Sequence, residues 1–212
     1  MKTQAQISAI IEELKQLYPD ALCSLEYQKD YELLFSVRLA AQCTDARVNL
    51  VTPALFERFP TLEAFAAATP DEVGEYVRSC GFWRAKAKDI VGSAQILLRD
   101  FGGKVPDNMD DLLRLPGVGR KTANLILGDV YGKEGYVCDT HCIRITGRLG
   151  ITDGSKDPLK VEQQLRKTIP PEESSDFCHR MVLHGRALCM ARGPKCEECP
   201  LKTLCDYGTN PQ

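Results

Sequence analysis

Four cysteines near the C-terminus are the side chains with the most specific chemistry in the sequence. Cys189, Cys196, Cys199 and Cys205 follow the spacing C-x6-C-x2-C-x5-C. Thiolates this close together in a chain bind zinc or an iron–sulfur cluster. Zinc ribbons usually carry two C-x2-C pairs, whereas this segment has one, so the spacing favours a cubane cluster over zinc. Four unrelated thiols are the remaining alternative.

A glycine-containing turn in the middle of the chain has the features of an anion site. Residues 115–123 read LPGVGRKTA. Apolar residues before and after this turn predict a short helix on each side, with Arg120 and Lys121 opening the second. Backbone amides of the turn and the N-terminus of the second helix would converge on one place and favour a phosphate there. A helical corner in which Gly117 and Gly119 only allow close packing is the alternative.

The elements that must position these residues are nearly all helices. Apolar residues recur at helical spacing in segments separated by capping residues, glycines and prolines. No stretch shows sustained two-residue alternation, so no sheet is expected. The expected helices cover residues 7–17, 31–41, 44–59, 61–68, 69–79, 84–99, 110–115, 120–130, 139–149, 158–168 and 174–188.

Length and composition set further bounds. A chain of 212 residues can form one large or two modest domains. With 27 Lys and Arg against 29 Asp and Glu, nucleic-acid binding would need a local basic face, and residues 78–148 supply twelve basic against eight acidic residues. No run of eighteen apolar residues and no signal peptide are present, so we expect a cytoplasmic protein, nucleoid-associated in a prokaryote, without membrane contact.

The ten cysteines of such a chain indicate reduced thiols and metal ligands rather than disulfides. Six of them fit no ligand spacing, and we expect them to be buried as small apolar residues. They are Cys23, Cys43, Cys80, Cys138, Cys142 and Cys178.

Taken together, these motifs resemble the endonuclease III family of base-excision DNA glycosylases. The resemblance rests on the turn at 115–124, on VCDTH at 137–141 and on the four-cysteine loop. It also includes AQCTD at 41–45 and GFWRAKA at 81–87. These motifs occur in the family's order and cover essentially the whole chain. It implies an all-α fold of two helical domains with DNA in the groove between them. One is a six-helix domain at 23–134 with a helix-hairpin-helix at about 108–131. The other joins 1–22 to 135–212 and holds a [4Fe–4S] cluster in the loop 189–205.

The resemblance also implies the catalytic residues. Lys121 matches the family's catalytic lysine, which forms a Schiff base with the deoxyribose, after which β-elimination nicks the strand 3′ to the abasic site. Asp139 matches the catalytic aspartate, which accepts a proton from the amine and stabilises positive charge at the sugar. From the residues alone, Lys121 would be a phosphate contact and Asp139 a helix N-cap. Cys138 and Cys142 are smaller than the residues expected at those positions.

Further residues are implied as DNA contacts. Gln42 and Phe82 match the positions that fill the space left by the extruded base, with phenylalanine where leucine is expected; a Phe82 packed in the core is the alternative. His141 either contacts phosphate or only caps and packs. The other implied contacts are Arg84, Lys86, Gly117, Val118, Gly119, Arg120, Arg144, Arg192 and Lys195.

The resemblance therefore implies a bifunctional DNA glycosylase and AP lyase that removes oxidised pyrimidines from damaged double-stranded DNA as a monomer. Lys121 and the short segment after Cys205 distinguish it from adenine-mismatch glycosylases, which lack this lysine and carry an extra C-terminal domain. There are three alternatives. The protein could be a monofunctional mismatch or other base-specific glycosylase of the same superfamily, a non-catalytic helix-hairpin-helix DNA-binding protein, or a ferredoxin-like electron carrier.

Overall fold

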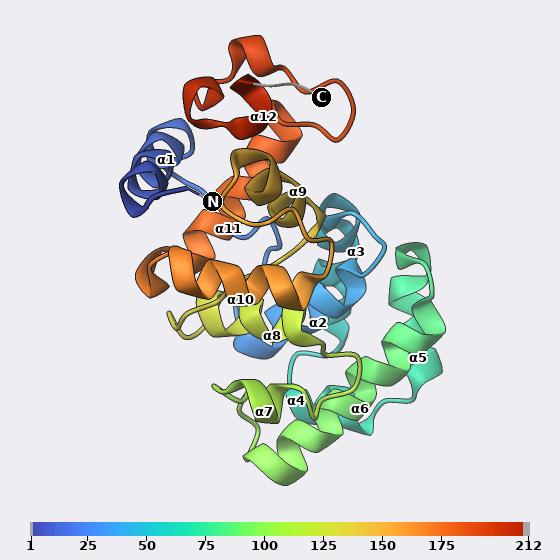
Figure 1. The fold of residues 1–212 in the computed structure, drawn as a ribbon. Helices are drawn as coiled ribbons and strands as arrows, with labels where there is room; N and C mark the ends of the chain where they lie inside the picture. Colours follow the sequence, from blue (N-terminus) through green and yellow to red (C-terminus); the bar gives the residue numbers. More distant parts are fainter. Residues whose placement is uncertain (1, 210–212) are drawn as a thin grey trace. The chain divides into compact units, whose positions relative to one another are not determined.

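The computed structural model describes residues 2–209, which form helices joined by turns and contain no strand (Figure 1). The prediction of an all-α protein is confirmed. The chain divides into two compact units. The hairpin unit is Cys23–Tyr131, and the terminal unit combines Met1–Leu22 with Gly132–Gln212.

The hairpin unit is built around a cluster of aromatic rings. Phe35 and Phe65 meet edge to face with ring centroids 5.0 Å apart, and Phe59 lies against Phe65 at 5.1 Å. The helices of this unit are α2 (Asp30–Ala40), α3 (Asp45–Arg58), α4 (Leu62–Ala67), α5 (Pro70–Val77), α6 (Trp83–Phe101), α7 (Met109–Leu112) and α8 (Arg120–Asp129), with the 3₁₀ turn η1 (Arg78–Cys80) before α6.

Threonine caps fix where several of these helices begin. The side chains of Thr44, Thr61 and Thr69 each accept a backbone N–H from the first turn of α3, α4 and α5, respectively. Such caps satisfy amides that have no partner within the helix. The expected starts of these three helices are confirmed to within one residue.

The terminal unit packs the N-terminal helix against helices from the other end of the chain. The apolar face of α1 (Gln4–Leu17) is buried through Ile7, Ile10, Ile11 and Leu14, and this helix contacts α11. The other elements are α9 (Thr140–Leu149), α10 (Pro158–Thr168), η2 (Pro171–Glu173), α11 (Ser174–Ala187), η3 (Cys196–Glu198), η4 (Lys202–Leu204) and α12 (Asp206–Thr209).

One expected helix is shorter in the structure, and three short turns near the C-terminus are additional to the expected helices. The helix expected over 110–115 is the single turn Met109–Leu112, because the chain turns into the hairpin directly after it. The short turns η3, η4 and α12 are not predicted from the sequence, since each has too few residues to show a periodic pattern.

None of the helices within residues 2–209 has the length and apolar character needed to cross a membrane.

Candidate active site and cluster site

The hairpin between α7 and α8 depends on one of its two glycines for its conformation. Gly117 has a φ of +72°, and a Cβ atom there would collide with Arg38 and Asp89. These two side chains form an ion pair of 2.7 Å beneath the turn. Gly119 has a φ of −105°, which any residue adopts. A Cβ at Gly119 would meet no atom within 4 Å, so its surroundings are open.

The N-terminus of α8 is consequently accessible to an anion. Gly119 is the N-cap and offers no side chain to accept the first amides of the helix. Val118 closes the turn by donating its N–H to Leu115 O at 3.1 Å. Arg120 and Lys121 are both exposed in the first turn of α8. Helix amides and two basic side chains therefore meet at one end of the hairpin unit, as expected for a phosphate contact.

Asp139 lies in the terminal unit as the N-cap of α9. Its carboxylate accepts the backbone N–H of Cys142 at 2.7 Å, and the residue is half-buried. This bond fixes the orientation of the carboxylate and leaves its second oxygen for other partners. The capping role that the residues alone indicate is confirmed, and it does not exclude a catalytic one.

Small thiols fill the space behind this cap. Cys142 is fully buried and its thiol contacts those of Cys138 and Cys178. Hydrogen bonds with these two thiols, together with burial, raise the pKa of Cys142 well above its ordinary value. The Cys142 thiol therefore stays protonated, and the three side chains pack as small groups. Burial is confirmed for these three cysteines and for Cys80.

The expectation of burial is wrong for two other cysteines. Cys23 and Cys43 are only half-buried, because each lies in a connection between helices rather than on the apolar face of a helix.

Gln42 and Phe82 have an unusual backbone in common. They are the only non-glycine residues with positive φ within residues 2–209, at 54° and 45°. A left-handed conformation costs a residue with a side chain about 1–2 kcal/mol. The Phe82 side chain is 72% exposed, so the alternative that it packs in the core is wrong. Strained, exposed residues of this kind cluster at functional sites, where the surrounding structure imposes the conformation.

Phe82→Ala should therefore change stability little and, if Phe82 has the role that the resemblance implies, slow the processing of a paired lesion. Surface substitutions usually change the free energy of unfolding by about 0.5 kcal/mol or less. Loss of a stacking ring worth roughly 1–3 kcal/mol should slow turnover on a paired lesion about fivefold or more. Turnover on a preformed abasic site should fall much less. A melting temperature lowered as for a buried phenylalanine, about 3–5 kcal/mol, would contradict this prediction.

Lys86 is buried, so the expectation that it contacts DNA is wrong. Its side chain is 1% exposed, and its Nζ donates to Leu39 O at 2.8 Å and Cys80 O at 2.5 Å. An ammonium held in this way cannot reach a phosphate. Arg84, two residues earlier, is exposed, with its guanidinium 4.2 Å from the centroid of the Trp83 ring.

His141 and Arg144 contact each other on α9. The Arg144 guanidinium lies 3.2 Å from His141 Nδ1 and donates to Cys189 O at 2.9 Å. Both residues are half-buried. Arg144 thus ties α9 to the start of the cysteine loop, while Arg192 and Lys195 are exposed within that loop.

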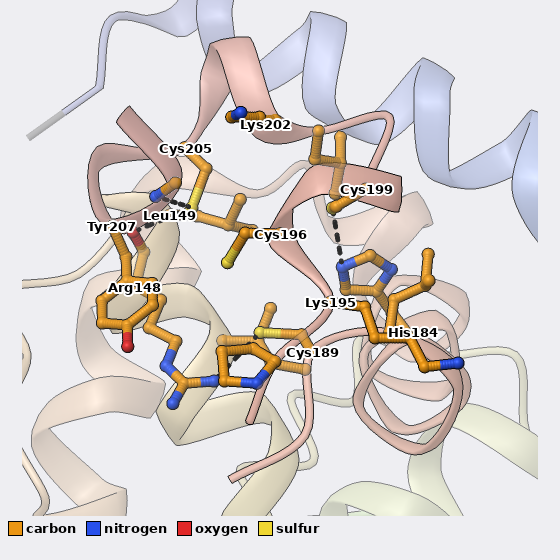
Figure 2. Close-up of a pocket in the computed structure, with 15 residues that line it drawn as sticks. Arg148, Leu149, His184, Cys189, Lys195, Cys196, Cys199, Lys202, Cys205 and Tyr207 are labelled. Atoms are coloured by element: carbon orange, nitrogen blue, oxygen red, sulfur yellow. Dashed lines mark hydrogen bonds between the residues drawn. The ribbon is translucent and has the colours of Figure 1, made fainter. Parts of the chain in front are cut away.

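The four C-terminal cysteines line one cavity in the terminal unit (Figure 2). Cys189, Cys196, Cys199 and Cys205 are all half-buried around it. The remaining lining is largely apolar and includes Leu149 and Leu201. Four thiols around a shielded cavity fit a cluster whose four irons each take one thiolate.

Polar hydrogens directed at the sulfur atoms support the same fit. Arg148 donates to Cys189 Sγ at 3.3 Å, and the Gly208 N–H donates to Cys205 Sγ at 3.3 Å. These are the contacts that a thiolate accepts. Within residues 2–209, no three Cys, His, Asp or Glu side chains are arranged to hold a single metal ion.

A buried histidine joins the third sulfur to the N-terminal helix. His184 Nε2 lies 3.6 Å from Cys199 Sγ, and His184 Nδ1 lies 3.2 Å from the hydroxyl of Tyr18. Burial lowers the pKa of His184 to about 4, so the ring is neutral. The tautomer protonated at Nε2 donates to the sulfur and accepts from Tyr18. Arg148 and His184 are not among the residues that the sequence indicates, because their contacts with the cysteine loop are tertiary and no local pattern contains them.

Comparison with known proteins assigns this architecture to a class. The family model described as "HhH-GPD superfamily base excision DNA repair protein" matches residues 35–171. Endonuclease III of Synechocystis sp. is 48% identical over 91% of this chain and 88% of its own length. Endonuclease III of Bacillus subtilis is 39% identical over 96% and 93%. A solved "Trapped Endonuclease III-DNA Covalent Intermediate" has a TM-score of 0.92 at 42% identity, covering 99% and 98% of the two chains. The chain belongs to the endonuclease III family of the HhH-GPD superfamily.

Proposed function

We propose that this chain is a bifunctional DNA glycosylase and AP lyase of base excision repair that acts on oxidised pyrimidines in double-stranded DNA. The observation that carries this function is the exposed Lys121 in the first turn of α8, directly after the hairpin. A phosphate bound at the hairpin amides would bring the neighbouring sugar close to this amine.

The proposed reaction is covalent. The unprotonated amine of Lys121 attacks the anomeric carbon of an extruded nucleotide, the base leaves, and ring opening gives a Schiff base. β-Elimination then breaks the bond 3′ to the abasic site, and hydrolysis of the Schiff base frees the lysine. The similar endonuclease III structure is named as a trapped covalent DNA intermediate, which supports a covalent step here.

Asp139 is proposed as the proton acceptor for this amine. Its carboxylate is oriented by the cap bond to Cys142, and a rigid carboxylate stabilises positive charge that develops at the sugar.

Asp139→Asn separates this role from capping. Asparagine caps a helix about as well as aspartate, so the melting temperature should change little. The chemical step should slow by about 10²–10⁴-fold, because the amide cannot take up a proton. Single-turnover base release, measured beside thermal unfolding, checks both parts. Near-normal activity would leave Asp139 as a cap alone.

DNA binding is proposed to involve both units. In the hairpin unit, the backbone of Gly117–Gly119 and the side chains of Arg84 and Arg120 face phosphates, and Gln42 and Phe82 enter the duplex. In the terminal unit, the proposed contacts are His141, Arg144, Arg192 and Lys195. We further propose that the units act as the family's two domains, 23–134 and 1–22 with 135–212.

The cysteine cavity is proposed to hold a [4Fe–4S] cluster through Cys189, Cys196, Cys199 and Cys205. When bound, the group would supply a structural cross-link that fixes the Cys189–Cys196 loop and presents Arg192 and Lys195 to DNA. Base release by a lysine nucleophile transfers no electron, so no redox step is required. We also propose that the protein acts as a cytoplasmic monomer.

Incubation of the purified protein with a duplex containing thymine glycol tests the function. Base release followed by a nick 3′ to the lesion is expected. Base release without a nick would instead indicate a monofunctional glycosylase, and binding without either product would indicate a non-catalytic DNA-binding protein.

A further inference from the structure

Lys86 is a buried amine in a place where an apolar side chain would ordinarily be found. It lies on α6 among residues of the hairpin unit's core, including Ala87 and Ile90. Burial lowers the pKa of Lys86, because the charged form is desolvated. A polar group in such a position is costly unless it is hydrogen-bonded. The two carbonyl oxygens at 2.8 and 2.5 Å are therefore the contacts that keep this amine in place.

Both carbonyls belong to helix ends. Leu39 lies in the last turn of α2, and Cys80 is the last residue of η1. Carbonyls at helix C-termini lack partners within the helix and form the negative end of its dipole. A single donor group thus joins the ends of two segments that are far apart in the sequence.

Each of these ends leads directly into a strained residue. Gln42 follows Leu39 by three residues and has a φ of 54°, and Phe82 follows Cys80 by two and has a φ of 45°. The backbone N–H of Lys86 also donates to Phe82 O at 3.2 Å. Next to the two strained residues, the thiols of Cys43 and Cys80 are in hydrogen-bonding contact.

We propose that Lys86 is the positioning residue that holds the Gln42 and Phe82 loops in register, so that both side chains enter the duplex as one preformed wedge. This inference rests on the proposed function, because it assigns a cause to the geometry of the residues that replace the extruded base. Two separate loops can fill one gap in the base stack only if their spacing is fixed before binding.

The orientation of Trp83 is consistent with a fixed loop. Gly74 on α5 leaves room for the Trp83 ring, since a Cβ there would collide with it. With the half-buried Trp83 ring packed against Gly74 and with Lys86 holding Cys80, the intervening Phe82 is directed to solvent, where it is 72% exposed.

Lys86→Met tests the proposal, because methionine has similar length but donates to neither carbonyl. We expect turnover on a paired thymine glycol to fall roughly tenfold, as for loss of a stacked wedge, with turnover on a preformed abasic site much less affected. In a Gln42→Ala, Phe82→Ala background, the same substitution should cause no further loss, since coupled residues are not additive. Lys86→Gln, whose amide still donates, should recover part of the activity and serves if the methionine variant does not fold.

A matched control separates positioning from general destabilisation. Leu97→Ala removes a fully buried side chain from the same helix and should lower the melting temperature without changing the ratio of the two activities. Three outcomes would each overturn the proposal. The ratio of turnover on the paired lesion to turnover on the abasic site could stay unchanged in Lys86→Met and Lys86→Gln, or change equally in Leu97→Ala. The loss caused by Lys86→Met could also be additive in the Gln42→Ala, Phe82→Ala background.

A second readout does not depend on catalysis. Trp83 is the only tryptophan in the sequence and is adjacent to Phe82. The fluorescence anisotropy of the free protein should fall in Lys86→Met as the loop gains motion, and stay unchanged in Leu97→Ala. Wild-type protein that processes neither substrate would contradict the proposed function, whereas unchanged Trp83 anisotropy in Lys86→Met would contradict the positioning role.

Discussion

Lys121→Gln is expected to abolish both base release and nicking of a thymine-glycol duplex, while the variant still binds the DNA. The substitution removes the nucleophile on which the whole covalent route depends. It leaves the hairpin backbone and Arg120 unchanged, so the amides that face phosphate remain in place. Because Lys121 is exposed, its replacement should alter the free energy of unfolding by about 0.5 kcal/mol or less.

Reduction with borohydride gives the direct measurement. Wild-type protein should be trapped covalently on lesion DNA, since borohydride converts the Schiff base to a stable amine, and Lys121→Gln should give no adduct. Lys104→Gln is a matched control, because Lys104 is another exposed lysine of the hairpin unit and should be trapped like wild type. A trapped adduct in Lys121→Gln would show that another residue is the nucleophile.

Local signals made much of the fold predictable from the sequence. Helix starts at Thr44, Thr69 and Asp139 depend on a side chain and an amide three residues later, so the sequence contains both partners. The hairpin is equally local, since Gly117 and the first turn of α8 are neighbours in the chain. The resemblance to the family then indicated that the hairpin and the helix after Asp139 contribute to one function.

Lys86 shows where this reasoning fails. A lysine between other charged residues on an amphipathic helix is usually exposed, and its neighbours Arg84 and Lys88 are. Its burial depends on Leu39 O, 47 residues away in the sequence, and no local pattern indicates that contact. Positive φ at Gln42 and Phe82 is likewise imposed by tertiary packing, because neither residue favours it.

The cysteine site divides in the same way. The ligand spacing is a property of one short segment, and the four residues it indicated do line one cavity. Arg148 and His184, which contact the sulfurs, come from α9 and α11, and the Tyr18 hydroxyl that contacts His184 comes from the far end of the chain. Such partners are determined by the packing of helices and become visible only in the folded structure.

Replacing Cys189, Cys196, Cys199 or Cys205 by serine should lower bound iron and acid-labile sulfide to a small fraction of the wild-type content. A serine hydroxyl is a far weaker ligand for iron than a thiolate, and the hydrogen bonds from Arg148 and Gly208 suit sulfur acceptors. Iron and sulfide per chain, measured after anaerobic purification, check the expectation. Stoichiometric zinc without iron or sulfide in the wild type would overturn the cluster.

The same variants should expose the C-terminal segment to protease. Residues 188–205 contain only the short turns η3 and η4. The proposed cross-link at the cavity would therefore add substantially to the hydrogen bonds from Arg144 and Arg148 that hold this loop. Trypsin should then cut at Arg192 or Lys195 much faster than in the wild type, and DNA binding should weaken because these two side chains lose their fixed position. Cys178→Ser, in the same unit, and Cys23→Ser, in the other, should keep their iron. Full iron in a ligand variant, or iron lost equally in these controls, would show that the four cysteines are not the ligands.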